Sequence, residues 1–170
     1  MASETNKSVR ERHSRLLIVE DDAQQLHTLT DIMEDEGFDV TGCASAAEAM
    51  QHIESQDFGV AIVDYRLPDQ SGDQLLESIK SMSRRTRVII HTGYGSFESA
   101  KIAVNLGAFA YVEKLSNPDE LLRHVHRAFR EEIHSYADEL ETAVAQRTKE
   151  FEDANDKLRT KRPPTESRWV

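Results

Sequence analysis

GVAIVDYRLPD, residues 59–69, is the stretch that decides the fold. Four apolar residues in this stretch run directly into Asp64, and a proline follows four positions later. An apolar run without polar alternation is typical of a strand buried on both faces of a parallel sheet. A carboxylate that ends such a strand lies at the sheet edge where open α/β proteins bind their ligands.

Similar runs recur along the chain, and segments of helical period separate them. The runs are Leu16–Val19, a weaker one at Phe38–Cys43, Val60–Val63, Arg87–Ile90 and Phe109–Val112. Strands that alternate with helices predict βαβ units and a parallel sheet. We therefore expect an α/β fold with a doubly wound, five-stranded parallel sheet of the flavodoxin-like order 2-1-3-4-5.

The composition limits the partners that the chain can have. A net charge of −10 argues against a nucleic-acid partner, because phosphate contacts need a basic face, and also against an anionic membrane surface. Cys43 is the single cysteine, so no intramolecular disulfide can form, and we expect a reducing, cytoplasmic setting. No apolar run approaches the roughly 20 residues that a membrane-spanning helix needs.

The last predicted helix is unusually long. Asn117 is the expected N-cap, Pro118 takes the first helical position, and no helix breaker follows until Pro163. Beyond residue 130, residues spaced alternately by four and three form a predicted coiled-coil seam, which Arg147 weakens. The alternative is a solvated helix with accidental spacing. The seam positions are Ile133, Ala137, Leu140, Val144, Arg147, Phe151, Ala154 and Leu158.

These patterns divide the chain into four parts. We expect a disordered N-terminal tail at 1–14, a globular domain at 15–130, a C-terminal coiled-coil helix at 131–160 and a disordered tail at 161–170. The helix predicts a homodimer.

Chemically active residues follow four of the five predicted strands. Glu20 and Asp21 follow the first, Asp64 the third, Thr92 the fourth and Lys114 the fifth. In the order 2-1-3-4-5, the acids of strands one and three meet at one edge. Crowded carboxylates repel each other, and a hard divalent cation such as Mg²⁺ relieves the repulsion. The pattern predicts a Mg²⁺ site in which Asp64 forms an aspartyl phosphate, with Lys114 and Thr92 binding phosphoryl oxygens.

Four segments in this order, RLLIVEDD, VDYRLPDQSG, VIIHTGYGS and GAFAYVEK, resemble the receiver domain of two-component response regulators. The resemblance covers roughly residues 15–130. It implies that Asp64 accepts a phosphoryl group from a histidine kinase or a phosphotransfer protein. It also implies the roles of the other site residues: Glu20, Asp21, Asp64 and the backbone carbonyl of Arg66 as Mg²⁺ ligands, Lys114 as the phosphate-binding lysine, and Thr92 and Tyr111 as the switch pair.

Three other functions stay open. A Mg²⁺-dependent phosphatase typically has a second aspartate two residues after the first, but Arg66 occupies that position. We therefore expect no enzyme beyond self-catalysed phosphorylation and dephosphorylation. The chain could also be an interaction module that works without phosphorylation, or the receiver fragment of a larger hybrid signalling protein.

Leu115 departs from the family pattern, which has a proline after the lysine and usually a cis peptide bond between them. A cis bond costs about 2.5–4 kcal/mol before a non-proline residue but only about 0.5–1 kcal/mol before proline. The loop can keep a strained cis bond or adopt trans, and we expect trans, with Lys114 still reaching Asp64. The seven histidines show no metal-binding spacing, and Cys43 is expected to be a small buried core residue.

Overall fold

The computed structural model describes residues 14–93 and 96–160. The chain divides into two units, residues 1–133 and 134–170. The predicted disordered tails at 1–14 and 161–170 lie outside the described residues, apart from Ser14. Within the described part, no helix combines the length and apolar character needed to cross a bilayer.

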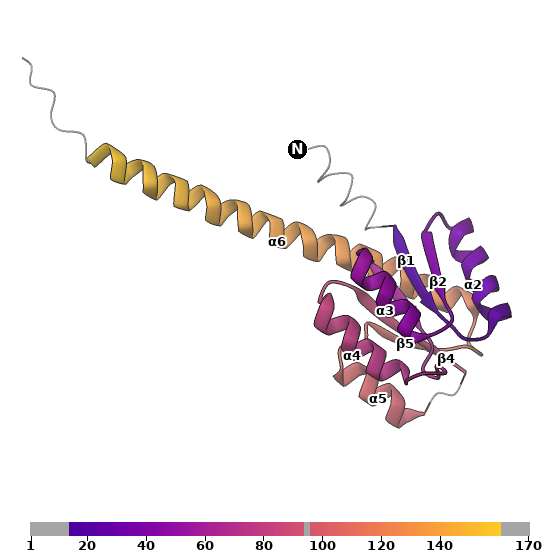
Figure 1. The fold of residues 1–170 in the computed structure, drawn as a ribbon. Helices are drawn as coiled ribbons and strands as arrows, with labels where there is room; N and C mark the ends of the chain where they lie inside the picture. The colour runs from indigo at the N-terminus through magenta and orange to yellow at the C-terminus, as the bar shows by residue number, and fades with distance from the viewer. Residues whose placement is uncertain (1–13, 94–95, 161–170) are drawn as a thin grey trace, which may run out of the picture. The chain divides into compact units, whose positions relative to one another are not determined.

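Five parallel strands form one sheet in the order β2-β1-β3-β4-β5, which confirms the predicted fold class (Figure 1). The strands are β1 (Arg15–Val19), β2 (Asp39–Cys43), β3 (Val60–Val63), β4 (Arg87–Thr92) and β5 (Ala110–Glu113). Strand β4 extends two residues beyond its apolar run, because Thr92 still pairs with Glu113 of β5.

Helices cover both faces of the sheet (Figure 1). The helices are α2 (Ala23–Asp35), α3 (Ala46–Ser55), α4 (Gly72–Met82), α5 (Phe97–Asn105) and α6 (Pro118–Thr160). In β3, Ala61 and Val63 face the core under α3, α4 and α5, whereas Val60 and Ile62 face the core under α2 and the start of α6. Burial on both faces explains why this strand is apolar at every position.

Helix α6 begins where the sequence predicts. The Asn117 side chain accepts the N–H of Asp119 at 3.0 Å, so the expected N-cap is confirmed. The first turns of the helix place Leu121, Val125 and Phe129 in the core. The helix then continues without a break to Thr160.

Within the second unit, the helix exposes large apolar side chains along the predicted seam. Leu140 is 52% exposed, Val144 59% and Phe151 73%. The side chain of Leu158 lies outside the described residues. Exposed apolar side chains at heptad spacing are what a coiled-coil seam presents in a single chain, and the coiled coil itself stays a prediction.

Asp69 ties the loop after β3 to the start of α3. Its carboxylate accepts the backbone N–H groups of Ala46 at 3.0 Å and Ala47 at 2.8 Å. Ser45 accepts the next free N–H, that of Glu48, at 3.2 Å. The bonds from Ala47 and Ala46 hold the pKa of Asp69 below its usual value. The first turn of α3 is therefore capped by a residue from a distant loop.

Replacing Asp69 should destabilise the fold in a pH-dependent way. We expect Asp69→Ala to lower the free energy of unfolding by about 0.5–1 kcal/mol at neutral pH, since the side chain is exposed. The folded-state pKa is depressed, so the stabilisation is present above the unfolded-state pKa and is lost as the pH falls through the folded-state value. Urea unfolding across a pH series measures this.

Glu54→Gln is the matched control, because Glu54 is an exposed carboxylate in the last turn of the same helix. The control should show no such loss. A penalty for Asp69→Ala that stays constant into acid would contradict the role of the carboxylate.

Candidate functional site

Strands β1 and β3 end at the same level, and this brings two carboxylates together. Val19 pairs with Val63, and the N–H of Asp64 donates to the carbonyl of Val19 at 2.9 Å. Glu20 and Asp64 therefore leave the sheet side by side, 2% and 7% exposed. Asp21 is exposed beside them, and oxygen atoms of all three carboxylates lie within 4.8 Å of one another. The predicted acidic cluster is present.

Lys114 supplies the positive charge in this cluster. Its Nζ donates to Asp64 Oδ2 at 2.8 Å and to Glu20 Oε2 at 2.5 Å. Burial alone lowers the pKa of Lys114, but its hydrogen bonds to Asp64 and Glu20 outweigh burial and raise the pKa, so the ammonium stays charged. Burial raises the pKa of Glu20, although the bond from Lys114 opposes the rise.

The donor set of this cluster fits a hard divalent cation. All three side chains offer carboxylate oxygen, and the exposed Asp21 leaves one side of the cluster open to water. Mg²⁺ prefers oxygen ligands and keeps several waters. The backbone N–H of Arg66 donates to Asp64 Oδ1 at 3.3 Å, which orients the carboxylate. The proposed ligand role of the Arg66 carbonyl stays a prediction.

Gly72 lets the start of α4 pack directly against the backbone of Asp64 and Tyr65. A Cβ at this position would lie 2.5 Å from the carbonyl oxygen of Asp64 and 2.8 Å from the Cα of Tyr65. The N–H of Gly72 also donates to the carbonyl of Tyr65 at 2.7 Å. The start of α4 can therefore touch the backbone that carries Asp64 only because residue 72 has no side chain.

The two predicted switch residues lie on neighbouring strands. Thr92 is buried at the end of β4, and its carbonyl accepts the N–H of Lys114 at 2.9 Å. The hydroxyl of Tyr111 on β5 shares a 2.8 Å hydrogen bond with the hydroxyl of Ser99 on α5. No sequence pattern singled out Ser99, which also forms a capping box with Ser96. The spacing of these two serines signals a helix start but carries no sign of the bond to Tyr111.

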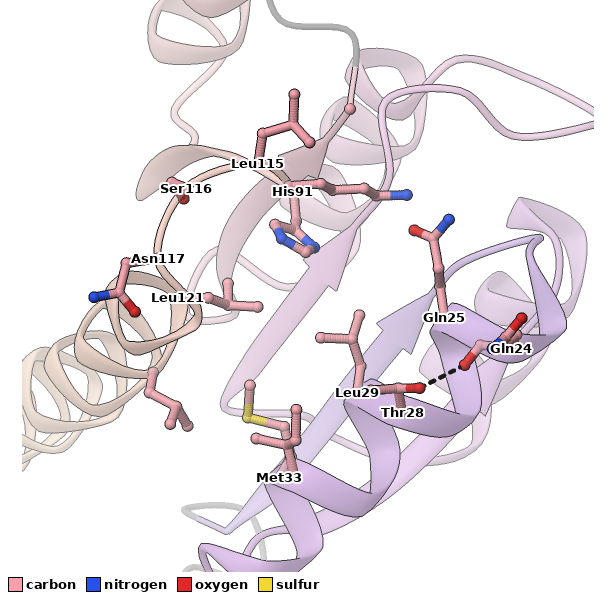
Figure 2. Close-up of a pocket in the computed structure, with 14 residues that line it drawn as sticks. Gln24, Gln25, Thr28, Leu29, Met33, His91, Leu115, Ser116, Asn117 and Leu121 are labelled. Carbon is pink, nitrogen blue, oxygen red and sulfur yellow. Dashed lines mark hydrogen bonds between the residues drawn. The ribbon is translucent and has the colours of Figure 1, made fainter.

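The Lys114–Leu115 peptide bond is trans, as expected, because no described residue has a cis peptide bond. Lys114 still reaches Asp64, and Leu115 is 91% exposed. A pocket of about 600 Å³ opens beside them, between α2 and the start of α6 (Figure 2). His91 projects into this pocket, and burial, with Lys114 nearby, lowers its pKa to about 4. The imidazole is therefore neutral at pH 7.

Comparison with known proteins adds to this geometry. Residues 16–126 match the family model of the response regulator receiver domain. The chain belongs to this family. The structural core extends beyond the matched residues, because Ala128 and Phe129 are also buried.

Relatives and solved structures agree with this assignment. The acid tolerance regulatory protein ActR of Rhizobium meliloti (strain 1021) is 39% identical over 107 residues, which are 63% of this chain and 55% of ActR. The chain therefore spans about half the length of that relative. A CheY-like receiver domain from Methanospirillum hungatei JF-1 is 36% identical with a TM-score of 0.69, over 72% of this chain and 98% of that one.

A second solved structure is the beryllofluoride-activated NtrC4 receiver domain dimer. It is 31% identical to this chain with a TM-score of 0.67, over 70% of this chain and 98% of that one.

Adding a methyl group at Gly72 should disturb this receiver domain. We expect Gly72→Ala to lower the free energy of unfolding by about 1–3 kcal/mol, because the new Cβ overlaps the Asp64 carbonyl and the backbone must move. Gly93→Ala is the matched control at the same edge of the sheet, since its Cβ would meet Lys114 Cδ at an ordinary 3.8 Å. Urea unfolding compares the two variants. Equal stabilities would show that residue 72 tolerates a side chain.

Proposed function

We propose that this receiver domain accepts a phosphoryl group on Asp64 from a histidine kinase or phosphotransfer protein. The observation that carries the proposal is the bonding of Lys114 to both Asp64 and Glu20 at a shared sheet edge. This arrangement places an ammonium next to a nucleophilic carboxylate that a rigid strand aims outward.

Glu20, Asp21 and Asp64 would hold Mg²⁺, together with the carbonyl of Arg66. When bound, the cation supplies positive charge that stabilises the phosphoryl oxygens. A carboxylate oxygen of Asp64 attacks the phosphorus of a phosphohistidine, and a P–O bond forms as the P–N bond breaks. The imidazole nitrogen keeps the electron pair and takes up a proton. Lys114 and the Thr92 hydroxyl bind the oxygens of the transferred group.

Arg66 offers no general acid at the position where phosphatases carry one, so the chemistry is confined to the domain's own aspartate. Water later hydrolyses the acyl phosphate and returns Asp64 to its carboxylate form. Phosphorylation draws Thr92 toward the phosphate, and Tyr111 follows. The relative that was solved as a beryllofluoride-activated receiver domain supports this proposal.

Phosphoryl transfer should be visible in the intact mass of the protein. Incubation with acetyl phosphate and Mg²⁺ should add one phosphoryl group to the full chain, and chelation of Mg²⁺ should prevent the addition. Asp64→Asn should abolish it, because the nucleophilic oxygen is replaced by an amide. Lys114→Ala should slow it by roughly tenfold or more, since a charge-assisted bond to the transferred group is lost.

Glu54→Gln is the control, since Glu54 is an exposed carboxylate in the last turn of α3 and its replacement should leave phosphorylation intact. A wild-type chain that takes up no phosphoryl group would favour the interaction module that works without phosphorylation. Addition that persists in Asp64→Asn would place the acceptor elsewhere.

We also propose that the C-terminal part of α6 pairs with a second copy of this chain. Its seam exposes Leu140, Val144 and Phe151. Pairing with a second helix would bury these apolar side chains and so stabilise the dimer. Arg147 interrupts the seam and limits the affinity. One similar receiver domain is described as a dimer, which supports self-association in this family.

Seam substitutions should change the dimer in opposite directions. Val144→Asp should weaken dimerisation by on the order of tenfold or more, because it places a charge in the apolar seam. Arg147→Leu should strengthen it by a similar factor, since two buried charges are replaced by apolar side chains. Sedimentation equilibrium of the full chain measures both. Thr142→Asp, on the side of the helix away from the seam, is the control, and a wild-type monomer at high concentration would refute the dimer.

A further inference from the structure

A second group of metal-ligating side chains lies at the edge of the sheet, outside the acidic cluster. Cys43 ends the edge strand β2, and Glu48 and His52 lie on α3, which begins three residues later. The thiol sulfur, a carboxylate oxygen and an imidazole nitrogen all lie within 4.8 Å of one another. The thiol is buried, with 1% of Cys43 exposed, whereas His52 is only partly buried.

The local fold explains why these three groups meet. Glu48 and His52 are four residues apart on α3, so they share one helix face. The turn between Cys43 and Ala46 brings this face over the end of β2. Glu48 Oε2 accepts the N–H of Ala44 at 2.8 Å, which orients the carboxylate toward the turn. Its other oxygen remains chemically able to coordinate an ion.

The ligand types select a particular kind of cation. A thiolate, an imidazole and a carboxylate suit borderline-soft ions such as Zn²⁺, whereas Mg²⁺ and Ca²⁺ prefer oxygen alone. Tetrahedral Zn²⁺ has ligand atoms about 3.3–3.8 Å apart, so ligand atoms that lie within 4.8 Å of one another must approach by up to about 1.5 Å. Glu48 and His52 reach solvent at least in part and can make this movement.

The charges also balance. One thiolate and one carboxylate neutralise a divalent ion, and the imidazole binds as a neutral ligand. Binding of the metal displaces the proton of the Cys43 thiol.

We propose that Cys43, Glu48 and His52 form a three-ligand site for Zn²⁺, with water as the fourth ligand. Binding replaces the thiol S–H bond with an S–Zn bond and releases one proton to solvent. The acidic cluster around Asp64 contains no sulfur or nitrogen ligand, so the two sites take different cations.

Cobalt provides the test, because Co²⁺ occupies zinc sites and its absorption reports its ligands. The full chain titrated with Co²⁺ should develop a thiolate-to-cobalt charge-transfer band in the near ultraviolet and the visible bands of tetrahedral cobalt. Excess Zn²⁺ should remove both. The acidic cluster cannot produce the first band, since it has no sulfur, so failure of this test leaves the phosphorylation proposal untouched.

Substitutions identify the ligands. Glu48→Gln and His52→Gln lie on partly exposed helix positions and should weaken Co²⁺ binding by roughly tenfold or more, whereas Cys43→Ser should abolish the charge-transfer band. His27→Gln is the control, because His27 faces Asp31 at the same four-residue spacing, 3.5 Å away, on α2. No charge-transfer band in the wild-type chain, or a band unchanged in His52→Gln, would overturn the proposal.

Discussion

One lysine ammonium bridges two carboxylates that the sheet places at the same edge. Because β1 and β3 end at the same level of the sheet, Glu20 and Asp64 lie side by side, and both are buried. Two buried like charges repel, and removal from water adds to the cost. Lys114 can reach both because β5 pairs with β4 and β4 pairs with β3, so the ends of these parallel strands lie along one edge of the sheet. The strand order is therefore a condition for the charge balance of the site.

The backbone around Asp64 is held from several directions. Arg66 donates an N–H to its carboxylate, Gly72 packs against its carbonyl, and Asp69 anchors the same loop to α3. Each contact costs conformational freedom that a nucleophile on a loose loop would keep. In return the carboxylate stands in one geometry, which a reaction at a single atom requires. By contrast, Asp21 and Leu115 are exposed, so the mouth of the site stays accessible.

The strands were predictable from periodicity, and the sheet order and the acidic cluster followed once a flavodoxin-like fold was assumed. Apolar runs mark strands, and a parallel sheet brings the ends of its strands to one edge. The trans bond at Leu115 was predictable from the intrinsic preference of the peptide unit. Contacts that depend on how a loop folds back were not predictable. Ser99 meets Tyr111 across 12 residues and Asp69 meets Ala46 across 23, and no spacing rule connects either pair.

The packing of helix α6 determines where the receiver domain ends. Phe129 lies three residues beyond the family match, yet its ring stacks on Phe38 with centroids 4.8 Å apart. His126 adds a contact to Glu36 at 3.1 Å. A chain that ended at residue 126 would lack Ala128 and Phe129, so Phe38 would lose its stacking partner. Every residue of the acidic cluster would still be present. The packed core is therefore longer than the segment that carries the acidic cluster.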